Sequence, residues 1–394
     1  MSLNLEEIDI LFLHQTGRRG GASTMLANVI RLLNRRFRCL VVCPAGDAHD
    51  QFEGAGAKVM NPDFRIHQFT HISGYSRPAY QPGFFRDLLG LAASRRRLKL
   101  LLSRLSPRIM HFNAVTLVPY LPVAKHLNAR SIVMVQETPV HGMAGVRTAW
   151  MKRMLSHSDS TLFISHFDRK AWSICPHKPA HVVPNWVDTL EFDYRRSGNP
   201  TRQRLGIPQG ATVCLFLGGI SELKGTLVAV QAIERASAER EIFLIIAGYS
   251  DQLLASGPKS QYTALVGQML ARLGSRVLCV GCVDDVISLY AAADIVLFPA
   301  TQAHQSRPMI EAGAMKKPVI ISSFPQLDEF CIDRVNCLRV PPSDKEALSG
   351  AILCLAGDSR LSARLVENNY SAVKEKHSTE AASRALLAAY EELL

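Results

Sequence analysis

The sequence predicts an α/β protein built from two doubly wound domains, each a parallel sheet with helices on both faces. Short β-branched runs alternate with amphipathic helical stretches along almost the whole chain, which is the pattern of parallel strands joined by helical crossovers. At 394 residues the chain exceeds one compact core and suits two domains of roughly 150 to 200 residues each. No fixed-period repeat or low-complexity tract indicates another architecture.

Ten strands are expected, five in each half. They lie at 9–13, 38–43, 109–112, 131–135 and 161–164 in the first half, and at 212–217, 242–247, 277–280, 295–298 and 318–321 in the second. Turn formers interrupt the polar stretch 195–210, so we predict an N-terminal domain over 1–195 and a C-terminal domain over 196–375. The last segment, 376–394, carries a helical apolar stripe and is expected to return to the first domain.

Composition and charge indicate in which cellular compartment the protein works and which kinds of partner it binds. The nine cysteines are scattered through strand-like segments, which favours buried thiols in a reducing compartment over a disulfide framework. The apolar run 8–13 is too short for a signal peptide, and no stretch approaches the roughly 20 apolar residues of a spanning helix. A cytoplasmic protein is therefore expected, and its net charge of +11 favours anionic partners such as nucleotide diphosphates or phospholipid surfaces.

A glycine-rich segment follows the first predicted strand. Gly20 and Gly21 precede a predicted helix, and glycine lets a ligand approach the backbone while the helix N-terminus offers unpaired N–H groups to an anion. We therefore predict a phosphate or acceptor cradle here, with a glycine turn that binds nothing as the alternative. The spacing is not G-x-G-x-x-G, which disfavours a dinucleotide site.

The second half opens in the same way. The strand predicted at 212–217 runs into Gly218 and Gly219, then Lys224, and then a helix from Thr226. A lysine beside a glycine turn at the end of a parallel strand is well placed to neutralise a diphosphate. Lys224 is the strongest single cationic candidate, and an unligated surface lysine is the alternative.

Five blocks of sequence follow one another in a fixed order between residues 183 and 344. They are V-P-N-W-V-D (183–188), G-G-I-S-E-L-K-G (218–225), D-D with L-Y-A-A-A-D (284–294), S-R-P-M-I-E-A with P-V-I (306–320) and the segment 336–344. In this order they resemble the motifs of the family 4 retaining glycosyltransferases, group 1. The resemblance implies the GT-B fold, in which two Rossmann-like domains face each other across a cleft.

The resemblance also implies a function and a set of site residues. It implies transfer of a sugar from a nucleotide-diphosphate donor to a glycan, lipid-linked or small-molecule acceptor, with retention and without a metal ion or other cofactor. Glu311 corresponds to the glutamate that holds the ribose hydroxyls. Catalysis is expected from Lys224, Glu311 and His111, donor binding from Gly20, Gly21, Gly218, Gly219, Lys224, Ser306, Arg307 and Glu311, and acceptor binding from Arg18, Arg19, His111 and Asn113. A buried structural histidine is the alternative for His111.

The chain departs from the family pattern at positions that contact the donor. Ala303 stands where the family has the first glutamate of its Glu-x7-Glu pair, and Gly219 stands where it has an arginine. We hypothesise that Arg18 or Arg19 replaces the missing cation and that His304 or Gln305 contacts the sugar. The departures also support an alternative, a catalytically altered or inactive homologue that serves as a binding or partner subunit. A GT-B epimerase or phosphorylase is a third possibility.

The segment 94–108 alternates arginine and lysine with leucine and predicts a basic amphipathic helix. Such a helix could rest on an anionic membrane to meet a lipid-linked acceptor, and a solvated face packed on the core is the alternative. The sequence has no helix-turn-helix, zinc or RNP pattern, so nucleic acid is not an expected partner. No cluster at metal-ligand spacing occurs either, and no metal site is predicted.

Overall fold

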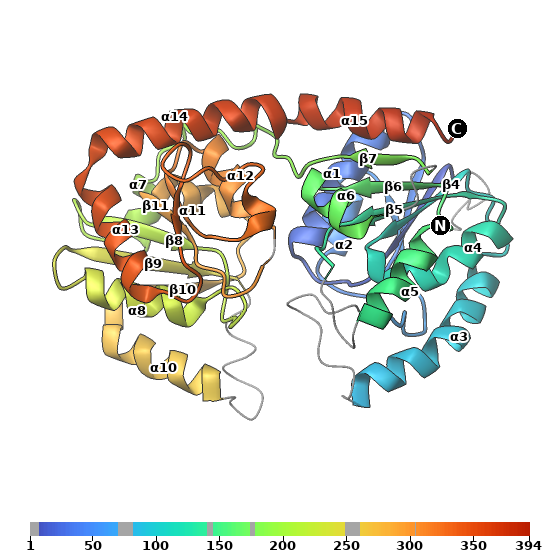
Figure 1. Cartoon of the computed structure of the whole chain (residues 1–394), viewed down its shortest axis with the longest axis horizontal. Coiled ribbons are helices and arrows are strands. Elements are labelled where there is room, and N and C mark those ends of the chain that lie inside the picture. Colours follow the sequence, from blue (N-terminus) through green and yellow to red (C-terminus); the bar gives the residue numbers. More distant parts are fainter. Residues whose placement is uncertain (1–7, 70–81, 140–144, 174–177, 249–260, 304) are drawn as a thin grey trace. The chain divides into compact units, whose positions relative to one another are not determined.

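The computed structural model describes residues 8–69, 82–139, 145–173, 178–248, 261–303 and 305–394. The chain divides into two compact units, drawn with their elements labelled in Figure 1. Unit 1 comprises Met1–Asn185 and Glu380–Leu394, and unit 2 comprises Trp186–Thr379. The division therefore comes before the boundary predicted after residue 195.

Unit 1 is built on a seven-stranded sheet in the order β3-β2-β1-β4-β5-β6-β7, in which every pairing is parallel. The strands are β1 (Ile10–His14), β2 (Cys39–Val42), β3 (Lys58–Met60), β4 (Ile109–Asn113), β5 (Arg130–Val135), β6 (Ser160–Phe163) and β7 (Ala180–Val182). The helices are α1 (Gly21–Leu33), α2 (His49–Gly54), α3 (Pro82–Leu102), η1 (Val115–Tyr120), α4 (Leu121–His126), α5 (Val146–Leu155), α6 (His166–Trp172) and α15 (Thr379–Glu391). Strand order reverses between β1 and β4, the position where doubly wound sheets bind ligands.

Unit 2 is built on a six-stranded parallel sheet in the order β10-β9-β8-β11-β12-β13. The strands are β8 (Thr212–Phe216), β9 (Ile242–Ala247), β10 (Val277–Gly281), β11 (Ile295–Phe298), β12 (Val319–Ser322) and β13 (Leu338–Val340). The helices are α7 (Asn199–Arg204), α8 (Thr226–Ala236), α10 (Gln261–Leu273), η3 (Gly274–Arg276), α11 (Val286–Ala292), α12 (Arg307–Ala314), η4 (Pro325–Leu327), α13 (Lys345–Gly357) and α14 (Ser359–Lys376). Here the order reverses between β8 and β11.

These two sheets confirm the predicted fold class. Each of the ten predicted strands is present, with ends shifted by a residue or so. Three of the four edge strands of the two sheets were not predicted, namely β3, β7 and β13. Each has only three residues, and β3 and β7 are partly exposed, so none stands out as an apolar run.

The stretch 195–210, predicted as the linker, lies inside unit 2. Its helix α7 is tied to the sheet by Arg202, whose Nη2 lies 2.7 Å from Asp294 Oδ1 and whose Nε donates to the carbonyl of Ala292. The polar residues and turn formers that predicted a linker therefore belong to a surface helix. The side chain of Arg202 anchors this helix to unit 2.

Helix α15 packs on unit 1 through its buried residues and three polar contacts. Tyr390 is fully buried, and its hydroxyl lies 2.5 Å from Nδ1 of His111 in β4. Glu391 pairs with Arg36 after α1, and Glu392 pairs with His181 in β7. Along the described chain, no helix is both long and apolar enough to cross a bilayer.

Candidate functional site

The loop between β8 and α8 is held in a single shape by glycines and one buried threonine. Gly219 and Gly225 have φ values of 61° and 80°, a region that favours glycine. The Thr226 hydroxyl donates to the Gly219 carbonyl at 2.8 Å and accepts from the Ser221 amide at 2.8 Å. The loop that precedes Lys224 is thus rigid before any ligand binds.

Gly225→Ala is expected to destabilise unit 2 strongly. A Cβ at this position would lie 1.8 Å from the carbonyl oxygen of Pro299, so the loop would have to move. The left-handed backbone alone costs a non-glycine residue about 1–2 kcal/mol. Gly206→Ala is the matched control, because Gly206 has φ 66° but open space around it. Thermal unfolding should show a larger loss for Gly225→Ala, and equal losses would contradict the clash.

Lys224 is a partly exposed lysine that follows this rigid loop. Burial of its surroundings lowers the pKa of the ammonium from its ordinary value of 10.5. Among the residues that the structure describes, no carboxylate lies within ion-pair distance of Lys224. A desolvated, unpaired ammonium is costly, and an anionic ligand would offset that cost.

Glu311 lies one turn into α12 and is held at both oxygens. Oε1 accepts from Arg307 Nε at 3.1 Å and Nη2 at 2.7 Å, and Oε2 accepts from the Tyr290 hydroxyl at 2.6 Å. Tyr290 is fully buried, and burial together with the charge of Glu311 raises its pKa well above 10.0. Three hydrogen bonds therefore fix the position of the carboxylate, and its remaining lone pairs are available to hydroxyl donors.

Two predicted donor residues also shape this helix. The Ser306 hydroxyl accepts from the Met309 amide at 3.3 Å and caps the N-terminus of α12, so its side chain has a structural role. Arg307 Nη1 is buried and has no hydrogen-bond partner in the described part of the chain. Sequence reasoning missed Tyr290 as a site residue, although it lies in the L-Y-A-A-A-D block that carried the resemblance.

Lys224 and Glu311 belong to the same edge of the sheet in unit 2. Their loops follow β8 and β11, which are paired neighbours. The Thr301 amide, after β11, donates to the Leu223 carbonyl at 2.9 Å, and its hydroxyl donates to Glu222 at 2.8 Å. The two loops are therefore bonded together where the strand order reverses, the position expected for a ligand.

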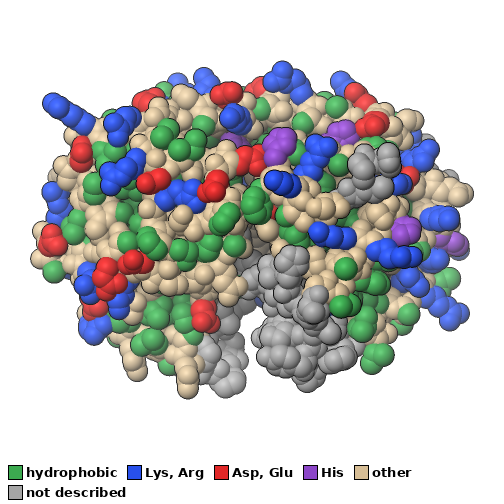
Figure 2. Space-filling view, viewed as in Figure 1, with side chains coloured by type: hydrophobic (Ala, Val, Ile, Leu, Met, Phe, Trp, Pro, Cys, Tyr) green, Lys and Arg blue, Asp and Glu red, His purple; other side chains and the backbone are tan. Residues whose placement is uncertain are grey.

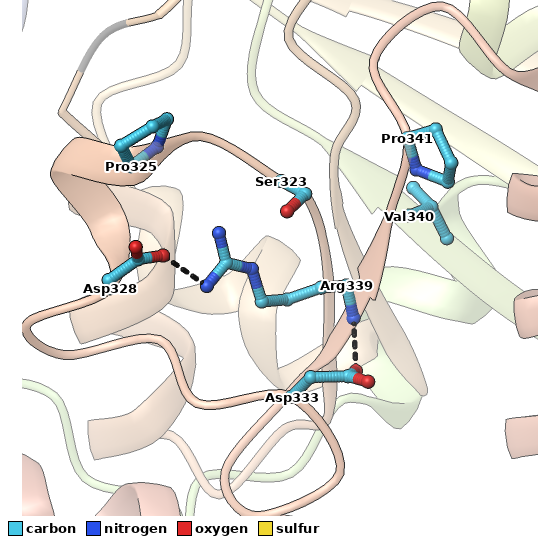
Figure 3. Close-up of a pocket in the computed structure, with 7 residues that line it drawn as sticks. All are labelled: Ser323, Pro325, Asp328, Asp333, Arg339, Val340 and Pro341. Carbon is cyan, nitrogen blue, oxygen red and sulfur yellow. Dashed lines mark hydrogen bonds and ion pairs between the residues drawn. The ribbon is translucent and has the colours of Figure 1, made fainter.

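An open depression of about 600 Å³ lies after β12 and β13 in unit 2. Figure 3 shows the residues that line it. Arg339 crosses it, with Nη1 2.5 Å from Asp328 Oδ1, and its backbone amide donates to Asp333 at 2.8 Å. The same guanidinium donates to the carbonyls of Phe324 and Cys331. Arg339 thus ties the segment after β12 to β13. These bonds occupy most of the N–H donors with which its guanidinium could bind a ligand.

The predicted glycine cradle in unit 1 opens α1 without a side-chain cap. Gly20 is the N-cap residue, with an extended backbone and open space where a Cβ would lie. Gly17 is the glycine that packing requires, because a Cβ there would lie 2.2 Å from the Pro44 carbonyl. The Arg19 guanidinium donates to the Asp47 carbonyl and lies 3.8 Å from Asp50, whereas Arg18 is exposed.

His111 and Asn113 are both fully buried, although we predicted that they bind the acceptor. Nδ1 of His111 bonds to Tyr390, and its Nε2 is buried without a partner among the described residues. The Asn113 carboxamide bonds to His14 and accepts from Gln136. In this arrangement neither residue has exposed surface for an acceptor. The burial of His111 and its bond to Tyr390 fit the alternative of a buried structural histidine.

Acidification is expected to destabilise unit 1 through two buried histidines. Burial lowers the pKa of His14 from 6.5 to about 4 and that of His111 to about 3. As the pH falls below 6.5, the unfolded chain binds protons at these histidines while the folded chain does not. The free energy of unfolding therefore falls by up to about 1.4 kcal/mol per pH unit for each residue. Unfolding temperatures measured between about pH 7 and about pH 5 should fall less steeply in His111→Gln than in the exposed control His157→Gln.

The remaining positions singled out in the sequence lie in the β8–α8 loop and in the segment that leads into α12. Ala303 is exposed, and Gly219 is buried in the β8–α8 loop. Gln305 precedes the cap of α12, whereas His304 lies outside the described residues. Among the described side chains, no group of three or more His, Cys, Asp or Glu is placed to hold a metal ion.

Two family models match the chain, one in each half. The model described as Glycosyltransferase Family 4 matches residues 19–190. The model described as Glycosyl transferases group 1 matches residues 211–358. The second match contains Lys224, Tyr290, Arg307 and Glu311, and the first contains the cradle of unit 1 and the buried histidine of β4.

Curated relatives are similar over part of their length. A lipopolysaccharide 1,2-N-acetylglucosaminetransferase of Salmonella typhimurium is 28% identical over 211 residues, which cover 52% of this chain and 54% of the relative. A D-inositol 3-phosphate glycosyltransferase of Xylanimonas cellulosilytica is 30% identical over 213 residues, which cover 52% of this chain and 50% of the relative. The chain spans about half the length of the curated relatives it matches.

Solved structures share the whole fold. HepE of Anabaena, solved in complex with UDP and glucose, superposes with a TM-score of 0.77 at 17% identity over 98% of this chain and 99% of the other. Sucrose-phosphate synthase from Thermosynechococcus elongatus superposes with a TM-score of 0.73 at 18% identity, again over 98% and 99%. At these identities the likeness establishes the fold, and it confirms the predicted GT-B architecture.

Proposed function

This chain belongs to the family 4 glycosyltransferases of group 1, and from that premise we propose that it is a glycosyltransferase. It transfers a sugar from a nucleotide-diphosphate donor to a glycan, lipid-linked or small-molecule acceptor, with retention of configuration and without a metal ion. The observation that carries this proposal is the edge of the sheet in unit 2. The loop that contains the unpaired ammonium of Lys224 is bonded there to the segment after β11, which leads into the helix of the fixed Glu311 carboxylate.

Each group has a part in the proposed chemistry. The Lys224 ammonium and the positive end of the α12 dipole stabilise the negative charge that develops on the leaving diphosphate. The Glu311 carboxylate accepts hydrogen bonds from the ribose hydroxyls, and Tyr290 and Arg307 hold it in place. Most of the rate enhancement then comes from positioning and electrostatics.

Nucleotide binding followed by donor turnover tests the proposal. Thermal shift of the full chain against UDP, GDP and ADP identifies the base, and release of free sugar from the matching nucleotide sugar then measures turnover. EDTA should leave turnover unchanged. Failure of all three nucleotides to bind, or binding that Lys224→Ala leaves unchanged, would refute the assignment.

A catalytically altered homologue is the second candidate, and two residues favour it. Ala303 lacks the carboxylate that meets the transferred sugar in the family, and Gly219 lacks the guanidinium that assists the lysine. A chain of this kind binds the nucleotide but releases no sugar with any acceptor. Conversion of the sugar of the donor into its epimer, without an acceptor, would instead indicate an epimerase, and dependence on inorganic phosphate would indicate a phosphorylase.

The same proposal includes a cytoplasmic location with peripheral contact to the membrane through residues 94–108. Leu98, Leu102 and Leu105 are buried in the core of unit 1, whereas Leu100 is 66% exposed beside the exposed Arg96 and Arg97. Figure 2 shows Lys and Arg side chains, with hydrophobic ones beside them, on the part of the surface where α3 lies in Figure 1. Exposed leucine among arginines suits an anionic bilayer.

Sedimentation with vesicles tests this contact. Each arginine near the surface contributes about 1 kcal/mol of attraction to anionic lipid. The full chain should sediment with vesicles that contain phosphatidylglycerol, should stay in solution with pure phosphatidylcholine, and should lose binding when Arg96 and Leu100 are replaced by serine. Replacement of the exposed Arg35, after α1, by serine provides the charge control.

A further inference from the structure

Glu137 lies at the carboxyl edge of the sheet in unit 1, directly after β5, with its backbone firmly held. The indole Nε1 of Trp172, a fully buried residue, donates to the Glu137 carbonyl at 2.8 Å. The residue before it, Gln136, donates through its side chain to Asn113 at the end of β4. The residue after it, Thr138, donates to Asp168 of α6 at 2.6 Å. Two neighbouring elements, β4 and α6, therefore fix the position of this one residue.

The Glu137 carboxyl is left out of these contacts. Its Oε2 atom is buried and has no hydrogen-bond partner in the described part of the chain, although the residue as a whole is partly exposed. Burial raises the pKa of this carboxyl from 4.5 to about 7, hydrogen bonds from the backbone amides of Gln136 and Glu137 oppose that rise, and the nearby charge of Asp168 adds to it. A buried carboxyl oxygen without a donor destabilises the fold by about 1–3 kcal/mol or more. The fold itself gains nothing from it.

We infer that Glu137 is an acceptor-binding residue, and that its unpartnered oxygen takes a hydrogen bond from a hydroxyl group of a saccharide acceptor bound at this edge of unit 1. The inference rests on the proposed function. Strained or unsatisfied groups persist in a rigid frame mainly where a ligand completes them.

The chemistry of the site favours a hydroxyl over other ligand groups. Asp168 lies close enough to Glu137 to raise its pKa, so a phosphate or carboxylate would be repelled here. Both oxygens of Asp168 are already bonded, to Thr138 and to Ser165 at 2.6 Å each, so Asp168 does not compete for the same donor. A neutral hydroxyl can donate to the ionised carboxyl and accept from the protonated one, so it binds both forms.

Glu137→Gln is the discriminating variant, and Glu53→Gln on the exposed surface of α2 is its matched control. Saturation-transfer NMR of the full chain, with a panel of glucose, galactose, mannose and their N-acetylated forms, should detect at least one sugar with the wild type. That signal should fall at least fivefold in Glu137→Gln and remain in Glu53→Gln. Binding of the nucleotide found by thermal shift should be unchanged in both variants.

The outcomes separate this inference from the proposed function. If the sugar signal depends on Glu137 but no donor is turned over, the transferase assignment fails and the saccharide site stands. If a donor is turned over but no sugar signal is lost in Glu137→Gln, or the panel gives no signal at all, the role of Glu137 is refuted.

A second measurement checks the premise without any ligand. Because the folded pKa of Glu137 is raised, stability falls as pH rises from 4.5 towards 7. Glu137→Gln should therefore unfold at a higher temperature than wild type near pH 8 and at nearly the same temperature near pH 4. No difference at either pH would mean that the carboxyl is solvated or paired, which would also overturn the inference.

Discussion

Lys224→Ala is expected to weaken nucleotide-diphosphate binding by about 10- to 150-fold, because a hydrogen bond to a charged group contributes about 1.5–3 kcal/mol. The lysine is unpaired by any described carboxylate and follows a loop that Thr226 and two glycines hold rigid, so little reorganisation can compensate for its loss. Isothermal titration of the full chain with the nucleotide diphosphate measures the effect directly.

Two further measurements make this result specific. Lys224→Arg keeps the charge but changes the geometry, so it should recover only part of the affinity. Since burial lowers the pKa of Lys224, wild-type affinity should also decline as pH rises towards that lowered value, and the decline should be absent from Lys224→Ala. The ratio of the affinities for the nucleotide diphosphate and monophosphate should fall in Lys224→Ala. An unchanged ratio would show that the lysine does not contact the second phosphate.

Glu311→Ala is expected to lower the free energy of unfolding of unit 2 by about 3–5 kcal/mol, because removing one partner of a buried ion pair leaves the other unpaired. The side chains of Arg307 and Glu311 are only 15% and 10% exposed, and the Tyr290 hydroxyl would lose its acceptor as well. Chemical denaturation followed by tryptophan fluorescence measures the loss, and nucleotide titration should show weaker binding in the same variant.

Tyr290→Phe separates positioning from direct contact at Glu311. It removes one hydrogen bond and keeps the ion pair with Arg307, so the expected loss of stability is only about 1 kcal/mol. If Glu311 binds ribose, Tyr290→Phe should weaken the ribonucleotide several-fold and leave the 2′,3′-dideoxy analogue unaffected. Equal weakening of both nucleotides would mean that the ribose hydroxyls do not bind there.

Most of the fold could be predicted because its strands are apolar runs buried on both faces. Strands such as β9 and β11 have every residue buried, so the pattern is visible without tertiary context. The three-residue edge strands could not be found in this way, since β3 is paired on one side only and leaves Lys58 exposed. The division between the units was also hidden, because the contacts that keep 195–210 within unit 2, those of Arg202 with Asp294 and of Arg196 with Asp285, join residues about 90 positions apart along the chain.

Prediction of the site succeeded where chemistry depends on local sequence and stopped where it depends on distant partners. The glycine turn and Lys224 are contiguous, so their juxtaposition was predictable. The burial of His111 depends on Tyr390, which is 279 residues away along the chain. Glu137 drew no attention for the same reason: an unsatisfied oxygen is a property of its surroundings, and no residue pattern records it.

Unit 1 is discontinuous, since α15 reaches it only after the whole of unit 2 has been made. During translation, a chain that has left the ribosome up to residue 379 therefore holds a β4 histidine whose hydrogen-bond partner does not yet exist. The N-terminal half can collapse early but reaches its final stability only when the last residues emerge. Nascent-chain truncations before Tyr390 should be more sensitive to proteases in unit 1 than in unit 2, although unit 1 is synthesised first.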